Sequence, residues 1–187
     1  MRILIADDEA IIRIGLRTML EEMGHQVVGA AADGATAVRL AHTAQPDLVI
    51  LDIRMPELDG LTAAEMISAE RPVPILVLTA YSDRDLVDRA ASLAVHGYLV
   101  KPARDADLAA AIVLAVSHFG EWQELQQQAA SLQEALATRD LVDQAKQVLM
   151  QQKGITEREA FQWIQRRSRH RRCPMARVAR EVLEESP

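Results

Sequence analysis

The chain has 187 residues, of which 49% are hydrophobic and 26% charged, a composition that excludes a disordered protein and supports a globular one. Its single cysteine, Cys173, excludes an internal disulfide, and we find neither a signal peptide nor a membrane-spanning run, so we expect a cytoplasmic protein without membrane contact. The net charge of −6 is unevenly distributed: residues 1–137 have 10 basic and 20 acidic side chains, whereas residues 138–187 have 11 and 7. This asymmetry predicts two modules, of which the second binds a polyanion.

The first module alternates between short apolar runs and helical patterns. The apolar runs fall at 3–6, 26–30, 48–51, 75–78 and 97–100, and the helical patterns at 9–23, 34–44, 60–70, 83–94 and 105–118. Continuous apolar runs are typical of strands buried on both faces, as in a parallel sheet. Five strand–helix repeats therefore predict a doubly wound, flavodoxin-like α/β domain with strand order 2-1-3-4-5.

The next segment has the apolar spacing of a coiled coil. Steps of three and four residues connect Leu108, Ile112, Ala115, Phe119, Trp122, Leu125, Ala129, Leu132 and Leu136. Two consecutive steps of three, from Phe119 to Leu125, interrupt the heptad as a stammer does. We expect a coiled-coil linker over 118–137 that forms a homodimer seam. The alternative is a lone helix that packs on its own domain.

The tail, residues 138–187, predicts a small domain of three helices at 138–152, 156–170 and 174–185. Gly154 suits the end of the first helix, Thr156 to Glu159 form a capping box for the second, and Pro174 opens the third. The expected core positions are Val142, Ala145, Leu149, Ala160, Phe161, Ile164, Val178, Ala179 and Val182.

Functional side chains follow four of the five predicted strands. They are Asp7 and Asp8 after the first, Asp52 after the third, Thr79 after the fourth and Lys101 after the fifth. Each alone has a plain interpretation as a helix cap, a loop residue or a turn, but strand order 2-1-3-4-5 gathers them at one crevice. Crowded carboxylates favour a Mg²⁺ ion, Asp52 is then a nucleophile that can form an aspartyl phosphate, and Lys101 balances the phosphoryl charge.

This part, residues 1–117, closely resembles the receiver domain of two-component response regulators through the segments ILIADDE, VILDIRMPELDG, VLTA and GYLVKP. The resemblance implies that Asp52 accepts phosphate from a sensor histidine kinase. It also implies that Asp8 and Asp52 bind Mg²⁺ with the backbone carbonyl of Arg54, while Asp7 helps through water. Thr79 and Lys101 would contact the phosphoryl group, and Tyr98 would be the switch aromatic whose rotamer follows Thr79.

The tail contains a concentrated basic segment, RRSRHRR, at 166–172. Cations near a helix C-terminus explain one or two arginines, but five are better explained by phosphate binding. DNA and RNA both fit that chemistry. Residues 143–168, DQAKQVLMQQKGITEREAFQWIQRRS, and 175–183, MARVAREVL, resemble the ANTAR domain, an RNA-binding antiterminator module, although Gln147 and Ser168 depart from its usual pattern.

Together the two resemblances imply a regulator without enzymatic activity of its own. Phosphorylation would favour a dimer whose two basic modules bind RNA hairpins of nascent transcripts and prevent a terminator from forming. The candidate RNA contacts are Lys146, Arg167, Arg169, Arg171 and Arg172. Three alternatives remain: a tail that binds DNA as a transcription factor, a tail that makes only protein contacts, and regulation that does not need phosphate.

Overall fold

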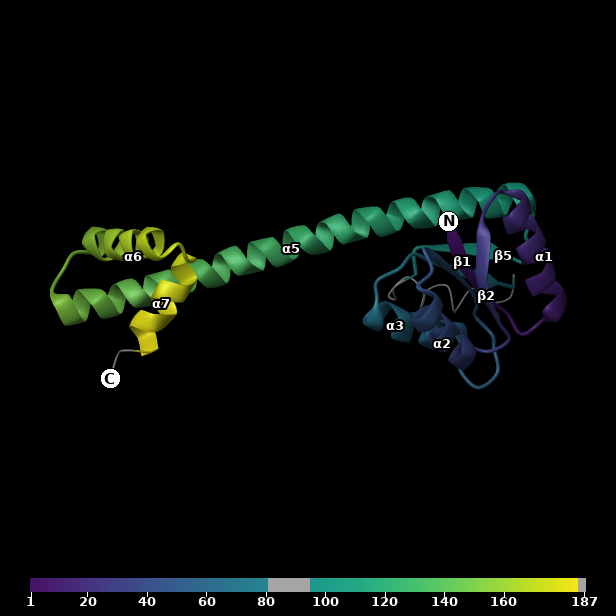
Figure 1. Cartoon of the computed structure of the whole chain (residues 1–187), viewed down its shortest axis with the longest axis horizontal. Helices are drawn as coiled ribbons and strands as arrows, with labels where there is room; N and C mark the ends of the chain where they lie inside the picture. The colour runs from purple at the N-terminus through teal and green to yellow at the C-terminus, as the bar shows by residue number, and fades with distance from the viewer. Residues whose placement is uncertain (81–94, 185–187) are drawn as a thin grey trace. The chain divides into compact units, whose positions relative to one another are not determined.

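A computed structural model describes residues 1–80 and 95–184 of the chain, which divides into two compact units at Gln123 and Glu124. In the first unit a parallel sheet has the order β2-β1-β3-β4-β5, which confirms the predicted topology (Figure 1). Its strands are β1 (Arg2–Ala6), β2 (Gln26–Ala31), β3 (Leu48–Asp52), β4 (Ile75–Thr79) and β5 (Gly97–Val100). The helix predicted at 83–94 lies outside the described residues.

Helices cover both faces of this sheet, and this double burial explains the continuous apolar runs. The helices are α1 (Ala10–Glu22), α2 (Gly34–Ala44), α3 (Gly60–Glu70) and the first part of α5 (Asp105–Lys153). Successive side chains of a strand point to opposite faces. Ile3 and Ile5 of β1 pack with α1 and α5, whereas Leu4 and Ala6 pack with α2 and α3, so two core layers enclose the sheet (Figure 1).

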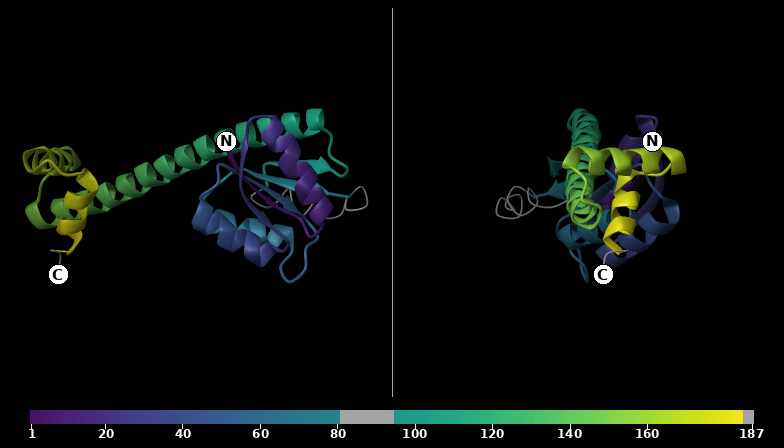
Figure 2. Two further views of the ribbon diagram at one scale, coloured as in Figure 1. Left: turned by 45° about the vertical axis from the view of Figure 1, so that its right-hand side comes forward. Right: turned by 90° about the vertical axis from the view of Figure 1, so that its left-hand side faces the viewer.

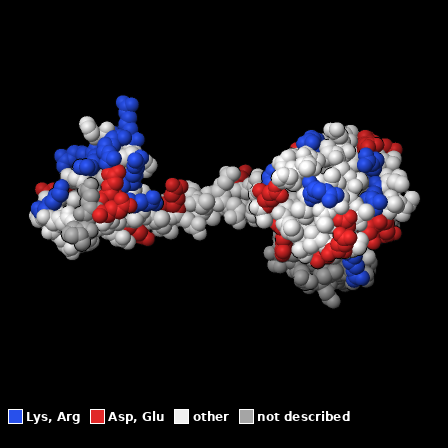
Figure 3. Space-filling view, turned by 60° about the horizontal axis from the view of Figure 1, so that its bottom comes forward, with Lys and Arg blue, Asp and Glu red and all other residues white. Residues whose placement is uncertain are grey.

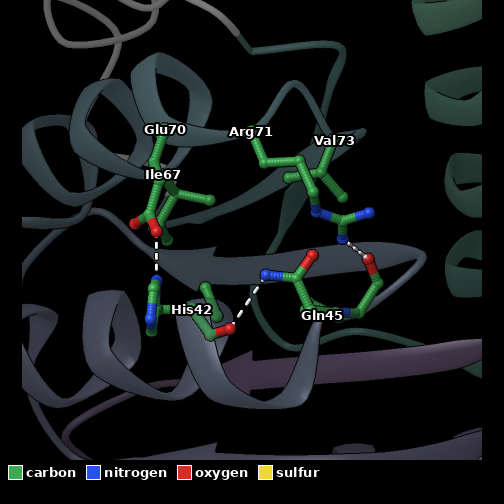
Figure 4. A pocket seen from close by; sticks show the side chains of 8 residues that line it. His42, Gln45, Ile67, Glu70, Arg71 and Val73 are labelled. Atoms are coloured by element: carbon green, nitrogen blue, oxygen red, sulfur yellow. Dashed lines mark hydrogen bonds and ion pairs between the residues drawn. The ribbon is translucent and has the colours of Figure 1, made fainter.

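The contact between α2 and α3 contains a small cavity, which Figure 4 shows from close by. His42 of α2 is hydrogen-bonded to Glu70 of α3, and Arg71 donates a hydrogen bond to the carbonyl oxygen of Pro46. The cavity measures about 10 Å³, enough for one water molecule at most. The contact therefore joins α2 to α3 and leaves room for no more than a water molecule.

Helix α5 is continuous from Asp105 to Lys153, so the separate helix that we expected to begin at residue 138 is wrong. The sequence there, Ala137 to Asp140, contains neither Pro nor Gly to end a helix. Gly120 is the one glycine inside α5, and a glycine in a helix interior costs only about 1 kcal/mol. The long helix and the first helix of the tail are thus one element.

The apolar stripe of α5 has two different environments. Leu108, Ile112 and Ala115 are buried in the core of the first unit. These three positions of the stripe therefore pack against the sheet and are not available to a dimer partner. From Leu125 onward the stripe is exposed, with Leu132 among its members. The predicted stammer at Phe119 to Leu125 falls where the stripe leaves the sheet.

In the second unit, α6 (Glu157–Arg171) and α7 (Met175–Glu184) pack against the last turns of α5 (Figure 2). The capping box is confirmed, because Thr156 Oγ1 accepts from the backbone N–H of Glu159 and the Glu159 carboxylate accepts from that of Thr156. Eight of the nine expected core positions are buried. Phe161 is the exception at 38% exposure, because it follows the buried Ala160 by one residue and so turns away from the core.

The described helices include none that combines the length and the apolar character required to cross a bilayer.

Candidate functional site

The sheet topology brings the predicted acidic and basic side chains to one edge. The Nζ atom of Lys101 lies 2.6 Å from Asp7 Oδ2 and 3.1 Å from Asp52 Oδ1. Strands β1, β3, β4 and β5 are adjacent in the sheet, so residues at their carboxyl ends meet without any long loop. The Lys101 ammonium thus links two carboxylates that are 45 positions apart in sequence.

Burial controls the electrostatics of this group. Asp7 is fully buried and Asp52 is 6% exposed. Burial raises the pKa of Asp52, the nearby charge of Asp7 adds to that rise, and Lys101 counteracts both. For Lys101, burial opposes the charge, but the contacts with Asp7 and Asp52 outweigh it and raise its pKa. The lysine therefore stays charged, as a group that balances anions must.

The same edge has the donor set of a divalent cation site. Carboxylate oxygens of Asp7, Asp8 and Asp52 all lie within 4.8 Å of one another. Asp7 Oδ2 is buried and has the Lys101 ion pair but no hydrogen bond of good geometry, so it retains capacity for a further partner. Asp8 is exposed and lines, together with Arg54, an open depression of about 510 Å³. Hard oxygen ligands beside open solvent fit Mg²⁺, which keeps several waters.

A close backbone approach holds the loop that follows Asp52. A Cβ added to Gly60 would lie 1.8 Å from the carbonyl oxygen of Asp52, so no other residue fits there without a shift. Gly60 also begins α3, and Asp59 caps that helix by accepting from the backbone N–H of Thr62. From the sequence Asp59-Gly60 reads only as a turn, and the steric requirement depends on a contact that the sequence does not reveal.

The two predicted switch residues have different environments in the structure. Thr79 is buried, and its hydroxyl donates a hydrogen bond of 3.0 Å to the carbonyl oxygen of Ala80. Tyr98 is 61% exposed and points away from the core that buries its neighbour Leu99. The structure thus places Thr79 at the site and Tyr98 outside it.

The predicted RNA contacts fall into two groups. The Nζ atom of Lys146 lies 2.6 Å from carboxylate oxygens of both Asp143 and Glu157, and Arg171 forms a bidentate ion pair with Glu181. The other three cations, Arg167, Arg169 and Arg172, are exposed and form no salt bridge with any described carboxylate. Figure 3 shows the basic side chains of this unit gathered on one side.

His96 is a buried residue whose environment sequence analysis missed. The backbone N–H of Ile75 donates to its Nδ1 atom at 3.2 Å, so that nitrogen carries no proton. Its ring meets Phe119 and Trp122 edge-on at centroid distances of 4.9 and 5.9 Å. Burial lowers the pKa of His96, and nearby His118 lowers it further. No spacing signal marks it, because its partners come from a neighbouring strand and from a later helix.

Residues 3–113 match the family model of the response regulator receiver domain, and residues 130–183 match that of the ANTAR domain. The chain is 52% identical over 183 residues to the transcriptional regulatory protein PdtaR of Mycobacterium tuberculosis, which covers 98% of this chain and 89% of that protein. It is 37% identical over 101 residues to the transcriptional regulatory protein YdfI of Bacillus subtilis. That match covers 54% of this chain and 47% of YdfI.

Solved receiver domains have the same fold as the first unit. The signal receiver domain of modulated diguanylate cyclase from Desulfovibrio desulfuricans G20 superposes with a TM-score of 0.59 at 32% identity, over 64% of this chain and 95% of that one. The REC domain of the response regulator AraT from Geobacillus stearothermophilus superposes with a TM-score of 0.56 at 35% identity, over 67% of this chain and 97% of that one. The chain therefore belongs to the response regulators that join a receiver domain to an ANTAR domain.

Proposed function

We propose that Asp52 accepts a phosphoryl group from a sensor histidine kinase. The observation that carries this proposal is the Lys101 ammonium, which lies 3.1 Å from Asp52 Oδ1 and is tied to Asp7 on its other side. Lys101 is thus in position to balance phosphoryl oxygens attached to Asp52. The residues that would hold Mg²⁺ are Asp8, Asp52 and the Arg54 carbonyl, with Asp7 through water, and the ion would supply further positive charge to the phosphoryl group.

Labelling tests the acceptor. Wild-type protein incubated with acetyl phosphate and Mg²⁺ should gain one phosphoryl group, detected by intact mass, and Asp52→Asn should gain none. Asp107→Asn is a matched control, because Asp107 is an exposed carboxylate in the first turn of α5. Labelling of Asp52→Asn at the wild-type level would place the acceptor elsewhere.

The proposed switch links this site to the rest of the chain. Phosphate on Asp52 attracts the Thr79 hydroxyl away from the Ala80 carbonyl, and Tyr98 moves inward to fill the space that Thr79 leaves. The event biases an equilibrium between two conformations of the receiver. The parts so connected are a receiver at residues 1–117, a coiled-coil linker at 118–137 and an ANTAR domain at 138–187.

The proposed output is binding of RNA hairpins in nascent transcripts, which prevents a terminator from forming. This is supported by the ANTAR match, by the exposed arginines of α6 that form no salt bridge with a described carboxylate, and by the 52% identity with a transcriptional regulatory protein. Arg167, Arg169 and Arg172 are the strongest candidates for phosphate contacts, because Lys146 and Arg171 already have anionic partners.

A gel shift compares the candidate ligands. The probes are a pool of RNAs with two stem-loops and randomised loops, and duplex DNA of equal length. The phosphorylated protein should retain a fraction of the RNA pool at concentrations where it leaves the DNA free. Tighter binding of the DNA would favour a DNA-binding output, and equally weak binding of both would favour a protein-interaction output.

The proposed dimer uses the exposed part of the α5 stripe, formed by Leu125, Ala129, Leu132 and Leu136. Leu132→Glu should shift the sedimentation of the phosphorylated protein from dimer toward monomer, because it places a charge in the seam. Gln127→Glu adds the same charge outside the stripe and should leave the dimer intact. A dimer that tolerates Leu132→Glu would place the interface elsewhere.

A further inference from the structure

Two cations of the C-terminal unit gather around Trp163. This residue precedes the buried Ile164 in α6, and its indole is half-buried against the core of the unit. The Nζ atom of Lys153, the last residue of α5, is 4.5 Å from the indole centroid, and the guanidinium carbon of Arg167 is 5.0 Å from it. Arg167 follows Trp163 by one helical turn, whereas Lys153 comes from the other side of the turn at Gly154.

Lys153 and Arg167 have less contact with carboxylates than three other cations of the unit. Arg171 lowers the pKa of the Glu181 carboxyl most, although Arg167 also lies near enough to lower it. Lys146, Arg171 and Arg177 each form an ion pair with a carboxylate. Among the residues that the structure describes, Lys153 and Arg167 form none. The face of the indole attracts each cation, but two like charges beside one ring oppose that attraction. Core packing accounts for the indole and leaves the two charges unexplained.

An unpaired nucleotide supplies what this cluster lacks. Its phosphate offers Lys153 a negative charge, and its base offers a flat aromatic face that stacks on indole and guanidinium planes. We propose that Trp163, Lys153 and Arg167 bind one unpaired nucleotide of an RNA loop, with the base on Trp163 and Arg167 and the phosphate on Lys153. This inference rests on the proposed RNA-binding function and adds the place and chemistry of a base contact.

The proposed contact distinguishes looped RNA from duplex RNA. Bases in a duplex are stacked on one another and offer no free face, so duplex reaches the cations but not the indole. An acidic peptide or inorganic phosphate also neutralises the cations without stacking. The indole is therefore the group whose response identifies the ligand.

Fluorescence of Trp163 gives the first test. Trp122→Phe leaves Trp163 as the only tryptophan, and this protein is titrated with a two-stem-loop RNA selected from the randomised pool. Stacking should quench the fluorescence of Trp163 on binding of the stem-loop RNA, while an unbroken RNA duplex or inorganic phosphate should leave it nearly unchanged. Equal quenching by the duplex or by phosphate would overturn the base contact.

Two substitutions separate the base from the phosphate. Trp163→Leu should weaken binding of the stem-loop RNA about tenfold without changing the slope of log affinity against log salt. Lys153→Ala should reduce the magnitude of that slope by about 0.7, the value for one phosphate of a single strand. Phe161→Leu is the matched control, an exposed aromatic of the same helix without a ring contact to a cation among described residues, and it should change neither quantity.

The outcomes separate this inference from the function on which it rests. If the protein with its native tryptophans retains no RNA from the pool, the proposed function fails and the nucleotide site fails with it. If RNA binds but Trp163 is not quenched, the base contact alone fails. Trp163→Leu is interpreted only if its thermal midpoint by circular dichroism matches the wild type, and the fluorescence titration needs no change at Trp163.

Discussion

Lys101 of the receiver and Lys146 of the ANTAR domain have nearly the same side-chain exposure, 16% and 13%, and each lies between two carboxylates. Their partners differ. The side chains of Asp7 and Asp52 are 0% and 9% exposed, whereas those paired with Lys146 are 51% and 67% exposed. Water screens the second pair of contacts but scarcely reaches the first. Burial of the partners, and not of the lysine, therefore separates a charged site inside the fold from a surface ion pair.

The largest expected effect follows directly from that difference. Lys101→Met should lower the free energy of unfolding of the receiver by about 3 kcal/mol, because it leaves two buried carboxylates without their cation. Lys146→Met should lower that of the ANTAR domain by less than about 1 kcal/mol. Urea unfolding in the absence of Mg²⁺, followed by circular dichroism, measures both. Similar losses for the two variants would contradict the role given to partner burial.

A pair of glycine substitutions compares a crowded backbone position with an open one in the receiver. Gly60→Ala should cost about 2–3 kcal/mol, because the added Cβ meets the Asp52 carbonyl oxygen and α3 has to shift. Gly15→Ala places the same methyl group on α1 where nothing lies within 4 Å, and should stabilise the protein by about 0.5–1 kcal/mol. Thermal unfolding of both variants shows the sign of each effect. A neutral Gly60→Ala would mean that the loop after Asp52 adapts freely.

The receiver site was predictable because strand order alone places Asp7, Asp52, Thr79 and Lys101 at one edge. Once the apolar runs indicate a doubly wound sheet, the positions at the strand ends leave little freedom. Distances and burial add what the sequence lacks, such as the shorter distance from Lys101 to Asp7 than to Asp52.

The helical parts were less predictable, because helix surfaces have no comparable rule. The apolar stripe of α5 has one spacing but two environments, and only the structure shows that Leu108 belongs to the core while Leu132 is exposed. The basic residues of α6 likewise look alike in the sequence. Whether a carboxylate lies opposite each one depends on α7, as the pair of Arg171 with Glu181 shows.

A smaller effect concerns pH. The pKa of His96 is lowered in the folded protein, so below about pH 6.5 the unfolded chain binds a proton that the folded chain resists. The stability that neutral His96 contributes is therefore fully present above that pH and is lost as pH falls toward the folded-state pKa. Thermal midpoints of the receiver from pH 8 to pH 5 measure this loss.

His96→Asn keeps an acceptor for the Ile75 N–H without a titrating group, so its profile should be flatter over this range. The substitution also removes the ring contacts with Phe119 and Trp122, so a lower midpoint at every pH is expected. An unchanged slope would mean that other groups cause the pH dependence.

The smallest expected effect distinguishes two arginines of α6. Arg169→Ala should reduce the salt slope of RNA binding by about 0.7, because Arg169 is free to meet a phosphate. Arg171→Ala should reduce it less, because Arg171 has to leave Glu181 before it binds RNA. Affinities measured over about a sixfold range of salt, from roughly 50 to 300 mM, give both slopes. A larger effect of Arg171→Ala would mean that its pair with Glu181 opens readily.

The central claim is that phosphate on Asp52 controls RNA binding by a separate module. Sequencing of RNA crosslinked to the wild type and to Asp52→Asn, each with and without acetyl phosphate, tests it most directly. We predict that phosphate enriches transcripts with paired stem-loops on the wild type and changes nothing on Asp52→Asn. Equal recovery of the same transcripts from both proteins under both conditions would contradict the claim.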